Sequence, residues 1–200
     1  MGLYSNVYKS NDSRVAGVKY IVKYVDAGKV VTCPKLPDTK TTDDDYLIAT
    51  GDFIFQTPAT DGFFNIEVTN RTGELKWKSV GSPGNLKSML ELDFDYAGIS
   101  SAFARFISEA KNDNLIMVIE RADCSGQRFL VGGCCLPAQM VGWEGTLGKS
   151  PQDDVKTNVK FEAYSSGLPV MLPDGIVLPE VDTFSGDFDP NDFDSQDFNT

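Results

Sequence analysis

Residues 115–131 read LIMVIERADCSGQRFLV, and this stretch decides the fold class. It opens with five consecutive apolar residues, 115–119, which predict a buried strand. Asp123 and Gly126 then supply turn chemistry, and residues 127–132 read as a strand that returns beside the first. The stretch therefore predicts a buried antiparallel hairpin.

Upstream of this hairpin, residues 99–110 are the stretch with the clearest helical spacing. Their apolar residues recur three or four positions apart, and Ser100 or Ser101 offers an N-cap. The polar run at 111–114 ends the periodic pattern. We expect one amphipathic helix that packs on a sheet.

Strand patterns continue on both sides of these elements. Residues 86–96 alternate apolar and acidic side chains, which predicts a long strand with its acidic residues facing water. Residues 136–143 and 155–165 read as two more strands around a glycine-rich loop at 142–148. These segments extend the sheet structure toward the C-terminus.

The N-terminal half predicts two further hairpins. The first joins residues 14–25 to residues 30–33, and the second joins residues 63–69 to residues 75–80. Between them, residues 46–55 read as two strands or one bulged strand. The whole chain thus predicts a mainly β fold, a sandwich or barrel of roughly nine short strands with one flanking α-helix.

The charge balance excludes several functions. The 200 residues hold 18 Lys or Arg, 29 Asp or Glu and no histidine, for a net charge of −11. An acidic chain is a poor binder of phosphate backbones, and without histidine neither a Ser-His nor a Cys-His nucleophile can form. We expect no enzyme, no cofactor and no metal site, and a hydrolase with two carboxylates is the enzymatic alternative.

The cysteines and the first acidic run have ordinary interpretations. No two of the four cysteines show the C-x-x-C spacing of a zinc or redox site. Cys134 and Cys135 are adjacent, so on a strand they point to opposite faces, and we interpret them as small buried apolar groups. The polar and acidic residues 38–45 predict a surface loop rather than a metal site.

The chain divides into a folded part, residues 1–179, and an acidic arm, residues 180–200. The arm holds seven carboxylates and no Lys or Arg, with aromatic residues every four or five positions: Phe184, Phe188, Phe193 and Phe198. Such a segment buries too little area to offset ordering, so we expect disorder until a partner accepts its aromatic rings.

The arm also imitates the start of a calcium-binding loop. Asp187, Asp189 and Asn191 occupy the first three ligand positions of such a loop. Asp192 and Phe198 stand where the loop requires glycine and a bidentate glutamate. We therefore interpret the arm as an acidic docking segment rather than a calcium site.

Residues 115–173 carry a spaced pattern: a strand ending in a D-x-x-G turn, a return to L-V-G, a P-A strand, a T-x-G-K loop and an F-x-x-x strand. Its residues are 115–120, Asp123, 126–132, Pro137, Ala138, Thr146, Gly148, Lys149, Asp153, Asp154, 161–163, Pro169 and Val170. The pattern resembles the major tail tube proteins of Bacteroidetes phages and prophages. The chain departs from it at Cys134 and Cys135 and in the long acidic arm.

The resemblance implies a structural virion protein. Such proteins are tail-tube-like β-sandwiches or barrels that stack as hexameric rings around a lumen through which DNA passes without specific binding. The implied partners are further copies of the chain and other tail proteins, such as the tape measure, terminator and baseplate proteins. The implied location is the phage tail, assembled in the cytoplasm of the bacterial host and without a membrane.

The same resemblance suggests where neighbouring rings meet. One loop reaches the next ring in such tubes, and residues 34–45 or 57–64 are the candidates here, with Phe63 and Phe64 as anchors. The alternative for both phenylalanines is packing in the core. The acidic arm would be a second docking segment.

Two other functions stay open. One is a neck ring, a tail terminator or a decoration protein of similar fold. The other is a carbohydrate- or protein-binding β module that stacks an exposed Trp77 or Trp143 on its ligand, although we expect buried tryptophans. The first fourteen residues, MGLYSNVYKSNDSR, hold no apolar core of signal-peptide length, so we expect a soluble protein made in a cytosol.

Overall fold

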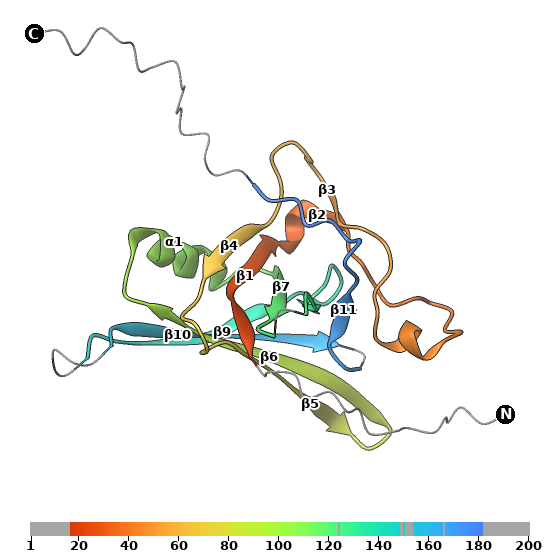
Figure 1. Ribbon diagram of the computed structural model, residues 1–200. Coiled ribbons are helices and arrows are strands. Elements are labelled where there is room, and N and C mark those ends of the chain that lie inside the picture. Colours follow the sequence, from red (N-terminus) through yellow and green to blue (C-terminus); the bar gives the residue numbers. More distant parts are fainter. Residues whose placement is uncertain (1–16, 124, 149, 151–153, 166, 182–200) are drawn as a thin grey trace, which may run out of the picture.

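The computed structural model describes residues 17–123, 125–148, 150, 154–165 and 167–181. Within these residues the chain forms eleven strands and one α-helix, so the expected mainly β class is confirmed. The strands lie in two antiparallel sheets that pack face to face, with a small third sheet beside them (Figure 1). This arrangement is the sandwich form of the prediction.

Each sheet draws its strands from distant parts of the sequence. The five-stranded sheet has the order β11 (Val170–Leu172), β8 (Arg128–Val131), β7 (Leu115–Arg121), β1 (Val18–Asp26), β4 (Phe64–Glu67). The four-stranded sheet has the order β5 (Glu74–Ser82), β6 (Asn85–Ala97), β10 (Lys156–Ser165), β9 (Gln139–Thr146). The two-stranded sheet pairs β2 (Val30–Thr32) with β3 (Ile54–Phe55).

The main core lies between the two large sheets. The four-stranded sheet buries the apolar residues of its alternating strands, such as Leu92 and Phe161, against Val22 and Met117 of the five-stranded sheet. The predicted helix is present as α1 (Ser101–Ala110), and it begins where the Ser100 hydroxyl accepts a hydrogen bond from the Phe103 amide. Its buried side chains, among them Phe103 and Phe106, close one end of this core.

A second core lies on the other face of the five-stranded sheet. Residues 27–63, which we call the cover segment, place Val30, Phe55 and Phe63 on the apolar face formed by Ile116 and Val118 of β7. This explains the continuous apolar run of β7: a strand covered on both faces has no reason to alternate. The 3-10 helices Ala27–Lys29 and Asp43–Tyr46 also belong to the cover segment.

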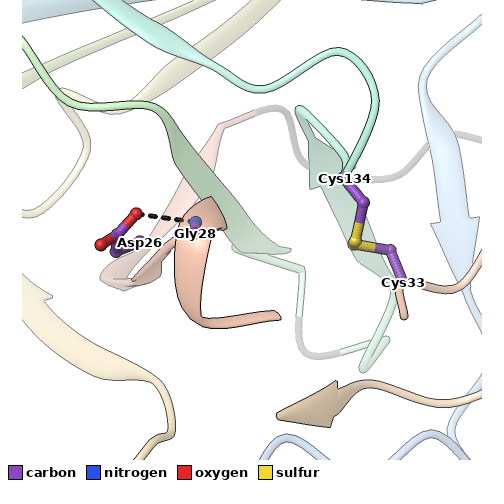
Figure 2. The surroundings of a disulfide bond; sticks show 4 residues. All are labelled: Asp26, Gly28, Cys33 and Cys134. Atoms are coloured by element: carbon purple, nitrogen blue, oxygen red, sulfur yellow. Dashed lines mark hydrogen bonds between the residues drawn. A yellow bond between two sulfur atoms is a disulfide. The ribbon is translucent and has the colours of Figure 1, made fainter. Parts of the chain in front are cut away.

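A disulfide between Cys33 and Cys134 ties the cover segment to the connection between β8 and β9 (Figure 2). Cys135 is a free thiol and is exposed. The expectation that Cys134 and Cys135 are buried apolar groups is therefore wrong. Gly132 has a positive φ of 80° and turns the chain after β8, so neither cysteine lies on a strand and strand geometry does not govern them.

The first predicted hairpin is wrong. β1 pairs with β4 and β7, whereas β2 pairs with β3. The turn residues are present, because the Asp26 carboxylate accepts a hydrogen bond from the Gly28 amide at 2.8 Å (Figure 2). They form a 3-10 turn that carries the chain into the cover segment instead of back along β1.

The second predicted hairpin is also wrong, because β4 and β5 belong to different sheets. The segment between them crosses from one sheet to the other and is fixed to β6. The Thr69 amide donates to the Asp95 carbonyl at 2.7 Å, and the Asp95 amide donates to the Thr72 hydroxyl at 3.1 Å. β5 instead forms a hairpin with β6.

Most of the other predicted strands are present, but those at residues 46–55 are largely absent. The hairpin of β7 and β8 is confirmed, as are the long strand β6 and the strands β9 and β10. Residues 46–55 were expected to be strands, but only Ile54–Phe55 forms one. Ile48 and Thr50 make isolated bridges, because this part of the chain meets single residues of other segments rather than a whole strand.

Candidate assembly surface

The outer face of the four-stranded sheet is covered with charge of both signs. Alternation along β5, β6, β10 and β9 sends apolar residues inward and charged residues outward. We call this the charged face. Its charged members are Glu74, Lys76, Lys78, Lys87, Glu91, Asp93, Asp95, Glu144, Lys156, Lys160 and Glu162.

The lysines of β10 are held by the carboxylates of β6. The ammonium of Lys156 lies 2.9 Å from a carboxylate oxygen of Asp95, and that of Lys160 lies 3.9 Å from Asp93. The amide of Asn158, between them on the strand, donates to both carboxylates. Burial raises the pKa of Asp95, but the hydrogen bonds from Asn158 and Lys156 outweigh it and leave the pKa below its usual value.

The lysines of the edge strand β5 are paired too. Lys76 contacts Glu74 at 2.8 Å, and Lys78 forms an ion pair with Glu91 on β6. The hydrogen bond that Lys76 donates to Glu74 raises the pKa of Lys76, and the one that Lys78 donates to Glu91 raises the pKa of Lys78. Four of the five lysines of the charged face are therefore paired with carboxylates of the same sheet.

The two outer strands of this sheet have open edges. Within the described residues, β5 pairs only with β6, and β9 pairs only with β10. Both are long, nine residues in β5 and eight in β9. Edge strands present unpaired N–H and C=O groups that can pair with another chain. A bulge at Val141 leaves residues 142–146 as the regular part of β9.

The predicted anchors Phe63 and Phe64 lie on different faces of the five-stranded sheet. Phe63 is fully buried in the second core, where its ring packs edge-on against Phe53 and Phe55. This is the core position that was the alternative to an anchoring role. Phe64 is half-buried, with its ring 5.6 Å from that of Tyr24. Phe184, Phe188, Phe193 and Phe198 lie outside the described residues.

Glu180 is attached to the folded part of the chain. Its carboxylate forms an ion pair with Lys23 of β1 and accepts a hydrogen bond from Asn65 of β4 at 3.1 Å. The hydrogen bond from Lys23, followed by that from Asn65, lowers the pKa of Glu180. The backbone of residues 179–181 also bonds to Phe63 on both sides. Residues 179–181 are therefore attached to Phe63, β1 and β4.

Both tryptophans are exposed, so the expectation of buried tryptophans is wrong. Trp77 on β5 is 53% exposed and Trp143 on β9 is 54% exposed. They face inward, but they sit on the two edge strands, beyond the area that the second sheet covers. Three strand spacings and four residues of register separate them, about 14 Å across and about 13 Å along the sheet. They do not form one aromatic platform.

Other site types find no support in the described part of the chain. No group of three His, Cys, Asp or Glu side chains there could hold a metal ion. The Asp45 carboxylate accepts hydrogen bonds from the Thr41 and Thr42 amides, which lower its pKa and cap a 3-10 helix. None of the described helices has the length and apolar character needed to cross a membrane.

Sequence reasoning noticed the acidic side of β6 but missed the charged face as a whole. The signal was available: charged or polar residues recur at every second position in 74–78, 91–95 and 156–162. Finding it required knowing that β5, β6 and β10 are neighbours, which depends on pairing across the chain.

Comparison with known proteins gives little further information. No protein-family model and no curated protein matches the chain. Among solved structures, a chain of the anti-feeding prophage (AFP) baseplate, determined by cryo-electron microscopy with six-fold symmetry, is similar to it. The match covers 84% of this chain and 100% of that chain, at 10% sequence identity and a TM-score of 0.40.

Proposed function

We propose that this chain is a structural protein of a phage tail whose copies close into stacked hexameric rings and form the tail tube. The observation that carries the proposal is the pair of open edges on one sheet. A strand edge left unpaired in water invites uncontrolled association, and closure into a barrel removes it.

The direction of the strands supports closure. Neighbouring strands in the sheet are antiparallel, so β5 and β9, three positions apart, also run in opposite directions. Rotation about an axis along the strands preserves their directions, so β9 of the next copy meets β5 as an antiparallel partner. Six copies then give a barrel of 24 strands, larger than the 16–18-stranded barrels that already hold an aqueous channel.

The charged face would line the lumen of this ring. Four of its five lysines, all but Lys87, are bound to carboxylates of the same sheet, so the face offers DNA phosphates few free cations. A binding surface for DNA needs uncompensated positive charge, and this face carries about as many carboxylates as lysines. DNA would pass such a wall without adhering.

Ring-to-ring contacts would come from other parts of the chain. Phe63 is buried, so in this proposal it holds residues 57–64 in place by packing in the second core. Phe64 then contacts the subunit of the adjacent ring. The phenylalanines of residues 182–200 would dock on an adjacent subunit. The remaining partners would be other tail proteins, and the location would be the virion.

Electron microscopy with mass photometry over a concentration series tests the proposal. Hollow rings or tubes are expected at high concentration. A monomer at every concentration would contradict ring formation and would favour a decoration or binding module. Isolated rings that do not stack would favour the neck or terminator alternative.

Cysteine cross-linking tests the interface itself. Ser79→Cys and Trp143→Cys lie on the same face of the two edge strands, so in a background with Cys124→Ser and Cys135→Ser they should link neighbouring copies. Non-reducing gels should show a ladder that ends at the closed ring, which gives the number of copies. The matched control, Ser79→Cys alone, should yield nothing larger than a dimer.

A further inference from the structure

A groove of about 540 Å³ opens between the two large sheets on the β5 side. Leu75 and Trp77 of the four-stranded sheet form one wall, and Ile119, Phe129 and Met171 of the five-stranded sheet form the other. Leu168, 58% exposed, lies at its rim. The wall residues of β5 and the five-stranded sheet face the space between the two sheets. The main core does not extend to this edge, so among the described residues these apolar side chains have no packing partner across the groove.

The first described residues of the chain lie at this groove. Gly17 and Val18 line it, and the Val18 amide donates to the Gly73 carbonyl at 3.1 Å. The Gly17 carbonyl accepts from the Ala122 amide at 3.2 Å. The described chain therefore begins at the groove wall, with Gly17. Residues 1–16 are the part of the chain that must start there.

We propose that residues 1–16 of the same chain occupy this groove and complete the core of the sandwich. The segment carries two apolar pairs, Leu3 with Tyr4 and Val7 with Tyr8. Tyr8 is eight positions before residue 16, a reach of about 27 Å in an extended chain, whereas the β5 wall from Glu74 to Trp77 spans about 10 Å. Val7 and Tyr8 can therefore reach any part of the groove.

Charge and position favour this segment over the other end of the chain. Residues 1–16 hold Lys9 and Arg14 against Asp12, so they carry no excess of negative charge. The charged residues of the lining are already paired, Glu74 with Lys76, Glu120 with Lys19 and Arg121 with Asp123. Residues 182–200 hold six aspartates and no Lys or Arg. They also begin beside β4, at the edge of the five-stranded sheet opposite to β11, which lines the groove.

Photochemical cross-linking in the full chain tests the proposal directly. A benzophenone amino acid replaces Tyr8, and the protein is irradiated at a concentration where mass photometry shows monomers. The excited ketone carbon inserts into a nearby C–H bond, a C–C bond forms, and the hydrogen moves to the ketone oxygen. Peptide mapping should find cross-links within one chain to Trp77, Phe129 or Met171.

The matched control places the same amino acid at Tyr164, which is 50% exposed on the charged face. It should give no cross-link to the groove. Cross-links from position 8 to other regions only, or only between chains, would overturn the proposal. Because the sample is monomeric, either result is independent of ring formation.

Tryptophan fluorescence gives a second readout. In a Trp143→Phe background, Trp77 is the single reporter. Replacing Leu3, Tyr4, Val7 and Tyr8 by serine should shift Trp77 emission to longer wavelength and increase its quenching by acrylamide, and Tyr164→Ser should change neither. Unchanged emission and quenching after the fourfold replacement would also overturn the proposal.

Discussion

Removing the Cys33–Cys134 disulfide should cost the protein a large part of its stability. The perturbation is Cys33→Ala with Cys134→Ala in a Cys135→Ser background. The reference protein carries Cys135→Ser as well, because in it the exposed Cys135 thiol, next in sequence to Cys134, could attack the disulfide and form a different link.

The expected magnitude follows from the size of the closed loop. The two cysteines are 101 residues apart, so the bond closes more than half of the described chain. The chain-entropy relation for a loop of this length gives about 4.7 kcal/mol at 25 °C. With a urea m-value of about 2 kcal/mol per M, the midpoint of unfolding should fall by about 2 M.

Urea titration at a concentration that keeps the protein monomeric measures this change. Cys135→Ser alone is the control and should unfold like the parent, because that thiol is exposed and unbonded. Adding reductant to the control should lower its midpoint to that of the triple variant. A loss below about 1 kcal/mol would contradict the entropic origin of the effect, because the unfolded chain would then already be confined without the bond.

Three further outcomes are expected. Gly62→Ala should destabilise by about 1–3 kcal/mol and loosen residues 179–181 in limited proteolysis, because its Cβ would lie 2.7 Å from the Pro179 carbonyl oxygen. Phe63→Ala should cost about 3–5 kcal/mol in urea unfolding, since it empties a fully buried ring site. Asp95→Asn should destabilise the fold most above about pH 4, and progressively less as the pH falls toward the lowered pKa of Asp95 in the folded state. The reason is that a carboxylate with a lowered pKa stabilises the fold only while it is ionised. Urea unfolding at pH 7 and at pH 3 measures the difference.

Local signals predicted the elements whose partners are close in sequence. The hairpin around Asp123 and Gly126 and the helix capped by Ser100 are defined by residues within a few positions of each other. Hydrophobic periodicity also located β6 and β10, because each buries one face only.

Long-range pairing could not be predicted from the same signals. The residues after Asp26 turn the chain, but whether it returns along β1 depends on the apolar patch around Ile116 that covers Val30. The disulfide could not be predicted either, because Cys33 and Cys134 are far apart in the sequence and no local spacing pattern indicates that they pair. The charged face was missed for this reason too: it exists only once β5, β6 and β10 are neighbours.

The central position of β1 has a consequence for synthesis. β1 ends at Asp26, but its partner β7 ends at Arg121, 95 residues later. At about 5–20 residues per second, the ribosome needs about 5–20 s to supply that partner. During this interval β1 can pair with β4 but not with its other neighbour β7, so the nascent chain exposes an apolar strand, with Val22 and Val25, that a chaperone could shield. Overproduction at lower temperature, which slows aggregation of such exposed strands, should raise the soluble yield.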